Sequence, residues 1–208
     1  MAGIVDYASL KTELANFTHR SDQSSELDTL IQFAEAEFNR KLRFRQMLTT
    51  IQPVNSGNVI ALPSDFLELR NVELQGDPLV TLKFVTTEQK DFYDSGVTTG
   101  QPRLYSIVGS NIYLYPTPDQ VYTANLQYFQ TLPTLVGGVN TTNWLLGLYP
   151  DLYLFGALVR AGLYIGLDPR LPEWSGFYTA ALADAMQAAA DSMYSGDTIT
   201  MQPDVSVW

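Results

Sequence analysis

Residues 27–54, L-D-T-L-I-Q-F-A-E-A-E-F-N-R-K-L-R-F-R-Q-M-L-T-T-I-Q-P-V, contain the change of pattern that decides the fold. In the first half, apolar side chains recur every three or four residues, as on one face of a helix: Leu27, Leu30, Ile31, Ala34, Phe38 and Leu42. Glu37 and Lys41 form an i,i+4 pair off this stripe, which is typical of a solvated helix face. From about Leu48 this period is lost, and β-branched and aromatic residues alternate with turn residues. The stretch therefore predicts a helix followed by a β region.

A shorter helix precedes this one. Asp6 is a suitable N-cap for a helix that carries Leu10, Leu14 and Phe17 on one face. His19–Asp22 is expected to form a turn, and Ser25 with Asp28 three residues later resembles a capping box at the start of the second helix.

The β region extends to about Leu132 and contains short runs with strand composition. The predicted strands are Thr49–Val54, Asn58–Ala61, Leu69–Leu74, Val80–Phe84, Leu104–Val108, Asn111–Tyr115 and Ala124–Gln130. Gly109 and Ser110 predict a two-residue hairpin turn of type II′. Residues 86–93 predict a short helix inside this region. Strands of this length and spacing favour a small sandwich or barrel.

Helical pattern returns at about Asn143, and Pro150 suits the first turn of a helix. The expected apolar face of that helix consists of Leu152, Phe155, Val159, Leu163 and Leu167. Asp168-Pro169-Arg170 should end it, and Pro172 should open a last helix that runs to about Met193.

The predicted fold class is α+β. Residues 1–47 and 140–195 should form an antiparallel helical bundle, and residues 48–139 should form an inserted small antiparallel β sandwich or barrel. Residues 196–208 should form an extended C-terminal tail without helical or strand periodicity.

Composition excludes several classes of function. The chain has no cysteine, which excludes disulfides, zinc–thiolate sites and cysteine nucleophiles. The N-terminus lacks the pattern of a secretory signal, and the apolar run Leu152–Leu167 contains Arg160 and is shorter than the roughly 20 residues of a membrane span. Only 16% of residues are charged, while there are 12 Tyr and 10 Phe, so we expect partners to cover part of the surface.

Charge is distributed unevenly along the chain. The net charge of -10 disfavours tight, non-specific nucleic-acid binding. After Arg170 the chain has acids but no Lys or Arg: Glu173, Asp184, Asp191, Asp197 and Asp204. The single basic cluster comprises Arg40, Lys41, Arg43 and Arg45. These cations could bind a neighbouring subunit or partner, or could complement the dipole at a helix C-terminus, and the interface interpretation is preferred.

No residue pattern indicates catalysis. His19, the only histidine, is expected to be a turn residue, and Glu35 and Glu37 are two positions apart and point to different helix faces. Phosphate-binding loops and hydrolase or metalloprotease motifs are absent from the sequence. We therefore expect no enzyme activity, cofactor or metal. Two alternatives remain: a carbohydrate-binding surface formed by Tyr113, Tyr115, Tyr122, Tyr128 and Phe129, and a hydrolase that uses two converging carboxylates.

Several phrases in the chain, taken in order, resemble the adaptor or head–tail connector proteins of tailed bacteriophages, the tail tubular protein A-like family. They are Tyr7 and Leu10 with His19–Asp22, Ile31–Glu35 with Asn39–Arg45, Leu62–Arg70, Tyr105–Gly109, Thr142–Leu146 and Tyr149–Leu158. No single phrase is specific, but their order and spacing cover most of the chain.

The resemblance implies a structural virion protein in a dodecameric ring between the portal protein and the tail nozzle, tail tube or fibre proteins. Double-stranded DNA would pass through without sequence-specific binding, and no membrane would be involved. The protein would be made in the cytoplasm of the infected bacterium. The helices would build the ring wall, and the β domain would project outside. A tail-completion or stopper subunit is the alternative virion role.

The expected binding residues are the basic cluster and part of the tail: Arg40, Lys41, Arg43, Arg45, Asp197, Met201, Val205 and Trp208. In this hypothesis the tail becomes ordered on the portal and Trp208 anchors it, because Trp is enriched among interface hot spots.

Overall fold

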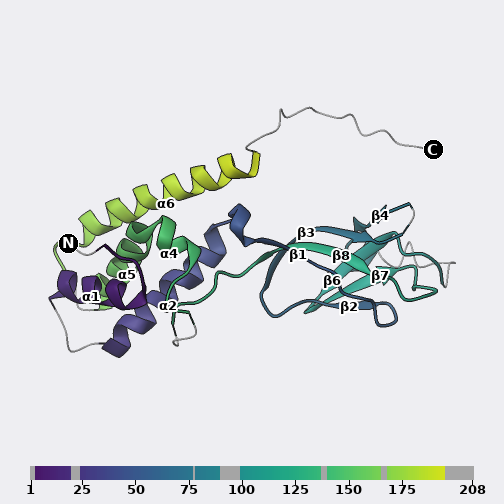
Figure 1. Cartoon of the computed structure of the whole chain (residues 1–208), viewed down its shortest axis with the longest axis horizontal. Coiled ribbons are helices and arrows are strands. Elements are labelled where there is room, and N and C mark those ends of the chain that lie inside the picture. Colours follow the sequence, from purple (N-terminus) through teal and green to yellow (C-terminus); the bar gives the residue numbers. More distant parts are fainter. Residues whose placement is uncertain are drawn as a thin grey trace. The chain divides into compact units, whose positions relative to one another are not determined.

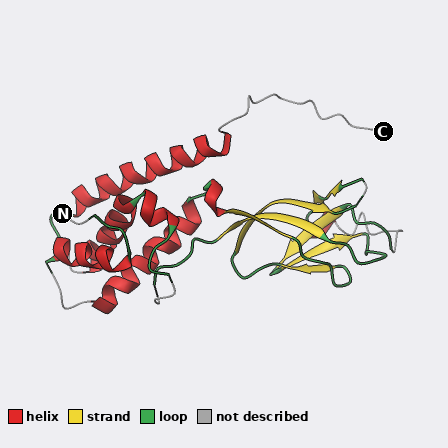
Figure 2. Cartoon of the chain, viewed as in Figure 1, coloured by secondary structure: helices red, strands yellow, loops and turns green. Residues whose placement is uncertain are grey.

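The computed structural model describes residues 3–19, 24–76, 78–89, 99–136, 140–164 and 168–194 (Figures 1 and 2). The chain divides into two compact units. The helical unit comprises Met1–Gln46 and Leu132–Trp208, and the β unit comprises Met47–Thr131. Helix and sheet therefore occupy separate parts of an α+β chain, and the predicted C-terminal tail lies outside the described residues.

Five α-helices of the helical unit are described: α1 Tyr7–Thr18, α2 Ser24–Lys41, α4 Trp144–Leu148, α5 Pro150–Tyr164 and α6 Leu171–Tyr194. The predicted cap of α1 is confirmed, because the Asp6 carboxylate accepts from the Ser9 amide at 2.8 Å and the Ser9 hydroxyl oxygen accepts from the Asp6 amide at 3.0 Å. Tyr149 separates α4 from α5, and Pro150 is the first residue of α5, where its missing N–H costs no helical hydrogen bond.

Helix α5 is the centre of this unit and contacts α1, α2, α4 and α6 (Figure 1). Phe155 and Val159, predicted to continue one buried stripe, are only half-buried, whereas Tyr153, Ala157 and Leu158 are fully buried. A single apolar stripe is expected for a helix that packs against a core on one side. Because α5 has helices on several sides, its buried residues do not follow one stripe. Leu163 and Leu167 lie outside the side chains that the structure describes.

Helices α2, α5 and α6 approach one another closely at Gly156. A Cβ placed on Gly156 of α5 would lie 3.2 Å from Phe38 of α2 and 3.3 Å from Tyr178 of α6. Phe38 also packs edge-on against Tyr153, with ring centroids 5.0 Å apart. The glycine thus lets three helices approach one another at one level.

The β unit has two four-stranded sheets, and its described strands close no barrel. The first sheet has the order β1 Leu48–Ile51, β8 Ala124–Gln130, β3 Phe66–Leu74, β4 Val80–Thr81; the second has the order β2 Val59–Ala61, β7 Asn111–Tyr115, β6 Leu104–Val108, β5 Lys83–Phe84. Buried residues of both sheets form one core, which includes Ile60, Val72, Ile112, Leu114 and Leu126.

Several strand predictions need correction. The first strand ends at Ile51 instead of Val54, and β3 begins at Phe66 instead of Leu69. The single strand predicted over 80–84 is two strands, because Leu82 donates to Val72 in the first sheet while Lys83 donates to Arg103, next to β6 of the second. β5 also runs parallel to β6, whereas every other strand pair described is antiparallel, as predicted.

The predicted hairpin is confirmed: Val108 pairs with Asn111, and Gly109 has a φ of 60°, a value that glycine adopts readily. Of the helix predicted over 86–93, residues 87–89 are helical and the rest lies outside the described part of the chain.

Candidate interaction surface

The basic cluster lies at the C-terminal end of α2, and two of its four cations have partners within the chain. Lys41 Nζ lies 2.6 Å from Glu37 Oε1, and Glu37 also pairs with Arg160 of α5. Arg43 Nη1 donates to the carbonyl oxygens of Asn39 and Leu42, at 2.9 and 2.7 Å. Since carbonyl groups at a helix C-terminus lack helical partners, Arg43 satisfies part of the end of α2.

The other two cations are placed differently. Arg40, in the last turn of α2, and Arg45, in the 3-10 helix Arg45–Met47, are exposed. Neither forms an ion pair with another described residue. The helix-dipole interpretation therefore accounts for Arg43, while Arg40 and Arg45 remain available to a partner.

Beneath this cluster lies a half-buried polar contact between α2, α5 and α6. Burial lowers the pKa of the Arg160 guanidinium, which stays charged beside Glu37. Burial raises the pKa of Tyr178, and the positive charge of Arg160 opposes that rise. The contact connects the three helices that also meet at Gly156.

A buried network on the same helix holds the segment that returns from the β unit. Glu35, only 4% exposed, accepts from the Leu135 amide at 2.8 Å, from the Thr134 hydroxyl at 2.6 Å and from the Tyr153 hydroxyl at 3.3 Å. Asn39, one turn later, accepts from the Leu132 amide at 2.7 Å. Burial raises the pKa of Glu35, although these hydrogen bonds oppose the rise. Glu35 is therefore a structural residue that fastens residues 132–135.

The N-terminal helix is attached by a second polar contact. The Tyr7 hydroxyl donates to Asp28 at 2.5 Å, and Lys11 Nζ lies 2.6 Å from the same carboxylate. Burial acts to raise the pKa of Asp28, but the hydrogen bonds from Lys11 and Tyr7 outweigh it and lower that pKa. Asp28 thus links α1 to α2.

His19 is the C-cap of α1, in the left-handed conformation with a φ of 53°, and its backbone N–H donates to Ala15 and Asn16. The prediction of a turn residue is confirmed at this position. The remaining predicted turn residues, 20–22, lie outside the described part of the chain.

Most of the aromatic run of the β region is buried. Tyr115, Tyr122, Tyr128 and Phe129 are buried, and Tyr113 is half-buried. Ile112 and Leu114 lie in the core, on the opposite face of β7 from the two tyrosines, as the alternation predicted. These side chains therefore do not form the exposed platform that stacking against a sugar would require.

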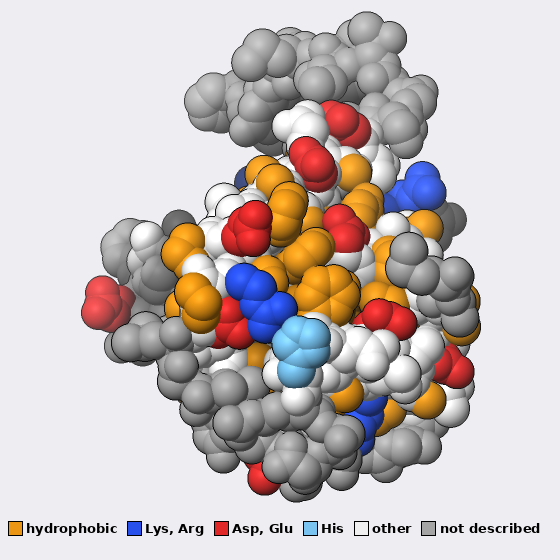
Figure 3. All heavy atoms as spheres, turned by 90° about the vertical axis from the view of Figure 1, so that its left-hand side faces the viewer, with side chains coloured by type: hydrophobic (Ala, Val, Ile, Leu, Met, Phe, Trp, Pro, Cys, Tyr) orange, Lys and Arg blue, Asp and Glu red, His pale blue; other side chains and the backbone are white. Residues whose placement is uncertain are grey.

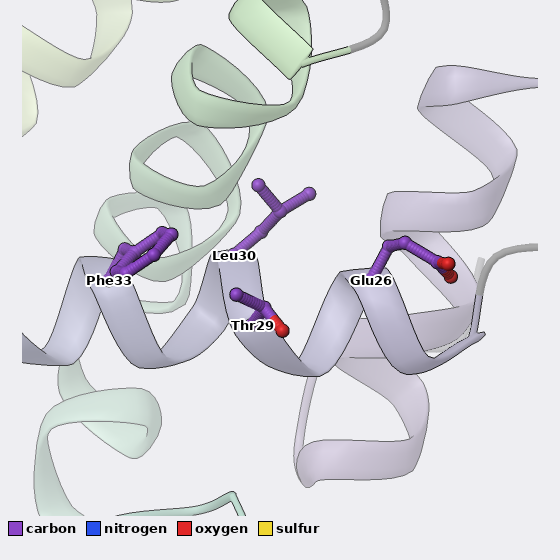
Figure 4. A pocket seen from close by; sticks show the side chains of 4 residues that line it. All are labelled: Glu26, Thr29, Leu30 and Phe33. Atoms are coloured by element: carbon purple, nitrogen blue, oxygen red, sulfur yellow. The ribbon is translucent and has the colours of Figure 1, made fainter.

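Phe33 was not predicted as a surface residue, although it lies off the apolar stripe of α2. It is 54% exposed and borders a small hollow that is also lined by Glu26, Thr29 and Leu30 (Figure 4). Phe177 of α6 is similarly exposed. A space-filling view of the helical unit shows hydrophobic side chains at the surface, bordered by charged ones (Figure 3).

The tail residues Asp197, Met201, Val205 and Trp208 lie outside the described residues, so the structure does not place them beside the basic cluster. Within the described residues, Asp, Glu and His side chains form no group of three suited to a metal ion. No helix of the described part has the length and apolar character needed to cross a membrane.

The chain matches a known protein family. The family model described as SU10 adaptor protein matches residues 5–201, which is nearly the whole chain and includes both units. No curated protein matches the chain. The match agrees with the resemblance to phage head–tail adaptors carried by the ordered phrases of the sequence. The chain therefore belongs to the SU10 adaptor protein family.

Proposed function

We propose that this chain is a non-enzymatic subunit of a ring that joins the portal vertex of a phage capsid to the tail. The family match over residues 5–201 carries the proposal. In this role the helices act as an antiparallel bundle in the ring wall, and the β unit acts as a sandwich that projects from the wall. Portal protein, neighbouring copies in a dodecamer and the tail components are the partners.

The mechanism of such a joint is geometric. Each copy makes a modest contact with the portal and with its neighbours, and cyclic repetition makes the assembly effectively permanent. A dilute free chain is then expected to be monomeric, and the portal gathers copies at high local concentration. The unpaired cations Arg40 and Arg45 and the exposed Phe33 are available for such contacts.

DNA passes through this ring without being held. The chain's net charge of -10 supports a channel wall that is acidic or neutral, because strong cationic contacts with phosphates would resist sliding. A strongly basic lumen in the assembled ring would contradict this part of the proposal.

The role is tested by removing the gene from the phage that encodes the chain. We expect DNA-filled heads without attached tails, and recovery of infectious particles when the full chain is supplied in trans. Normal tailed particles in its absence would overturn the proposal. Mass spectrometry of purified particles checks that the chain is a virion component.

The docking role of the tail has its own test. Truncation after Gly196 should leave the helical content and the thermal unfolding of the chain unchanged, and should weaken its binding to purified portal rings. The Trp208→Ala variant should reproduce part of that loss, because a buried Trp anchor is typically worth more than about 2 kcal/mol. Portal binding equal to that of the full chain would show that the tail is dispensable.

A further inference from the structure

The outward face of α6 carries small side chains. Gly176, Ala180, Ala183 and Ala190 are exposed and follow one side of the helix, where Gln187 interrupts the small residues between the last two. The opposite side, with Trp174, is buried in the helical unit. A Cβ added to Gly176 would meet no atom within 4 Å. Because interaxial distance depends on the side chains at the contact, this line allows close approach of another helix.

One border of this face is acidic, and of its acids Glu173 interacts electrostatically with Arg170, which directly precedes α6. Glu173, Asp184 and Asp191 are exposed, and α6 contains no Lys or Arg. None of the three forms an ion pair with a described residue, and Asp191 accepts only from the exposed Gln187, at 2.9 Å. A partner for this face should therefore bring positive charge.

The outward face of α2 has the complementary chemistry. Phe33 is exposed there, and Arg40 follows it by seven residues, which is about two turns or roughly 10 Å along the helix. Arg40, and Arg45 just beyond the end of α2, are exposed and form no ion pair with a described residue. The face thus combines an aromatic side chain with unpaired positive charge.

One molecule cannot bring these two faces together. α5 contacts both α2 and α6 and lies between them (Figure 1). The buried sides of α2 and α6 pack into the unit. Arg40 acts electrostatically on Tyr178, on the buried side of α6, and forms no ion pair with the exposed acids of that helix. A second copy can bring its α2 face to the α6 face of the first, and repetition of such a head-to-tail contact closes a ring.

We infer that the exposed face of α6 is the docking surface for the α2 face of a second copy of this chain. Phe33 packs on the line of small residues, and Arg40 and Arg45 pair with Asp184 and Asp191. The inference rests on the proposed ring function, and it names the two surfaces that meet. Exposed ion pairs contribute little individually, so the contact is weak alone and sensitive to salt.

A charge-swap experiment on the full chain tests this pairing. The variant R40E/R45E has two acidic faces, and the variant D184R/D191R has two basic faces. By sedimentation velocity at low ionic strength and rising protein concentration, the unmodified chain should self-associate and should dissociate in high salt. Each variant alone should associate about tenfold more weakly or worse, because like charges meet. An equal mixture of the two should regain association, since each supplies the face that the other lacks.

Two further variants make the test specific. K83E/R103E makes the same change in net charge as R40E/R45E, but on exposed residues of the β unit, and it should associate like the unmodified chain. Ala183→Trp adds bulk to the small-residue line at an exposed helix position, so it should leave helical content unchanged and weaken association.

Three results would overturn the inference. The unmodified chain does not self-associate at any concentration, or either charge-swap variant associates as strongly as the unmodified chain, or the mixture associates no more strongly than each variant alone. These outcomes differ from a failure of the proposed function, in which the chain would be missing from purified particles. If the chain is present in purified particles but the mixture does not regain association, only the α2–α6 pairing is contradicted and the proposed function is not.

Discussion

At the scale of single residues, the buried carboxyl group of Glu35 should make stability depend on pH. Burial raises its pKa above the ordinary value of 4.5, so the folded chain binds this proton more tightly than the unfolded chain does. The free energy of unfolding should therefore fall as pH rises from 4.5 through the raised pKa. Glu35→Gln keeps an acceptor for the Leu135 amide and should remove this part of the pH dependence.

Urea unfolding at a series of pH values measures the effect, and Glu88→Gln at an exposed position is the control. Glu35→Ala leaves the Leu135 amide and the Thr134 hydroxyl without their acceptor, and should cost about 2–3 kcal/mol. An unchanged pH profile for Glu35→Gln would show that this carboxyl group titrates alike in the folded and unfolded chain.

Two helical glycines should respond in opposite directions to the same substitution. Gly156→Ala gains helix propensity but presses a methyl group against Phe38 and Tyr178, which are both buried, and should lower the free energy of unfolding by about 1 kcal/mol. The methyl group of Gly176→Ala meets no neighbouring atom, so this variant should raise the free energy of unfolding by about 1 kcal/mol. Thermal and urea unfolding of both variants provide the comparison, and stabilisation by Gly156→Ala would show that the neighbouring rings yield.

The sequence predicted the roles of residues whose partners are close in the sequence. It did not predict the roles of residues whose partners are distant in the sequence. The Asp6 cap and the Gly109 turn follow from neighbours within three residues, and both are confirmed. The roles of Glu35 and Asn39 were not predicted, because their partners are backbone amides about a hundred positions away, and an amide has no signature in a sequence. The basic cluster was found as a group, but its division into two paired and two unpaired cations depends on the geometry at the end of α2.

At the scale of elements, the start of α4 depends on Asn143. Its side-chain oxygen accepts from the Leu146 amide at 2.8 Å, and its amide group donates to the Pro133 carbonyl and the Tyr153 hydroxyl. Asn143→Ala removes the cap and leaves these buried groups without their partner, and should cost about 2–3 kcal/mol. Asn143→Asp keeps the cap but cannot donate to Pro133, so its loss should be intermediate at neutral pH. Equal stability of the two variants in urea unfolding would contradict a capping role.

Strand boundaries could be predicted only where a whole extended segment pairs within one sheet. The run over 80–84 has continuous strand composition, yet its two halves pair with β3 and β6 in different sheets. Local composition reports that a segment is extended, but it does not report which neighbour it pairs with. The same limit applies to α5, because contacts on several sides remove the single stripe on which its predicted face was based.

At the scale of the whole molecule, the β unit is an insertion whose two ends are paired. β1 follows the helical unit directly and β8 precedes its return, and Leu48 lies opposite Phe129 in the ladder that joins them. Opposed Cα atoms in such a ladder are about 5 Å apart, so a few residues can span the gap. Glu35 and Asn39 hold residues 132–135 through contacts that belong to the helical unit alone.

Replacement of residues 48–130 by a short Gly/Ser linker should therefore leave the helical unit folded, with its free energy of unfolding within about 1 kcal/mol of that in the full chain. The β unit has its own core, so Leu126→Ala in the full chain should lower protection of β3 and β8 in hydrogen exchange and leave α5 unchanged. Circular dichroism and thermal unfolding assess the shortened chain, and Leu158→Ala, in the core of the helical unit, is the reciprocal control. Loss of helix in the shortened chain, or loss of protection in α5 on Leu126→Ala, would mean that the helices depend on the insertion for their stability. In the proposed adaptor role, such independence would let a load on the β unit leave the helical unit folded.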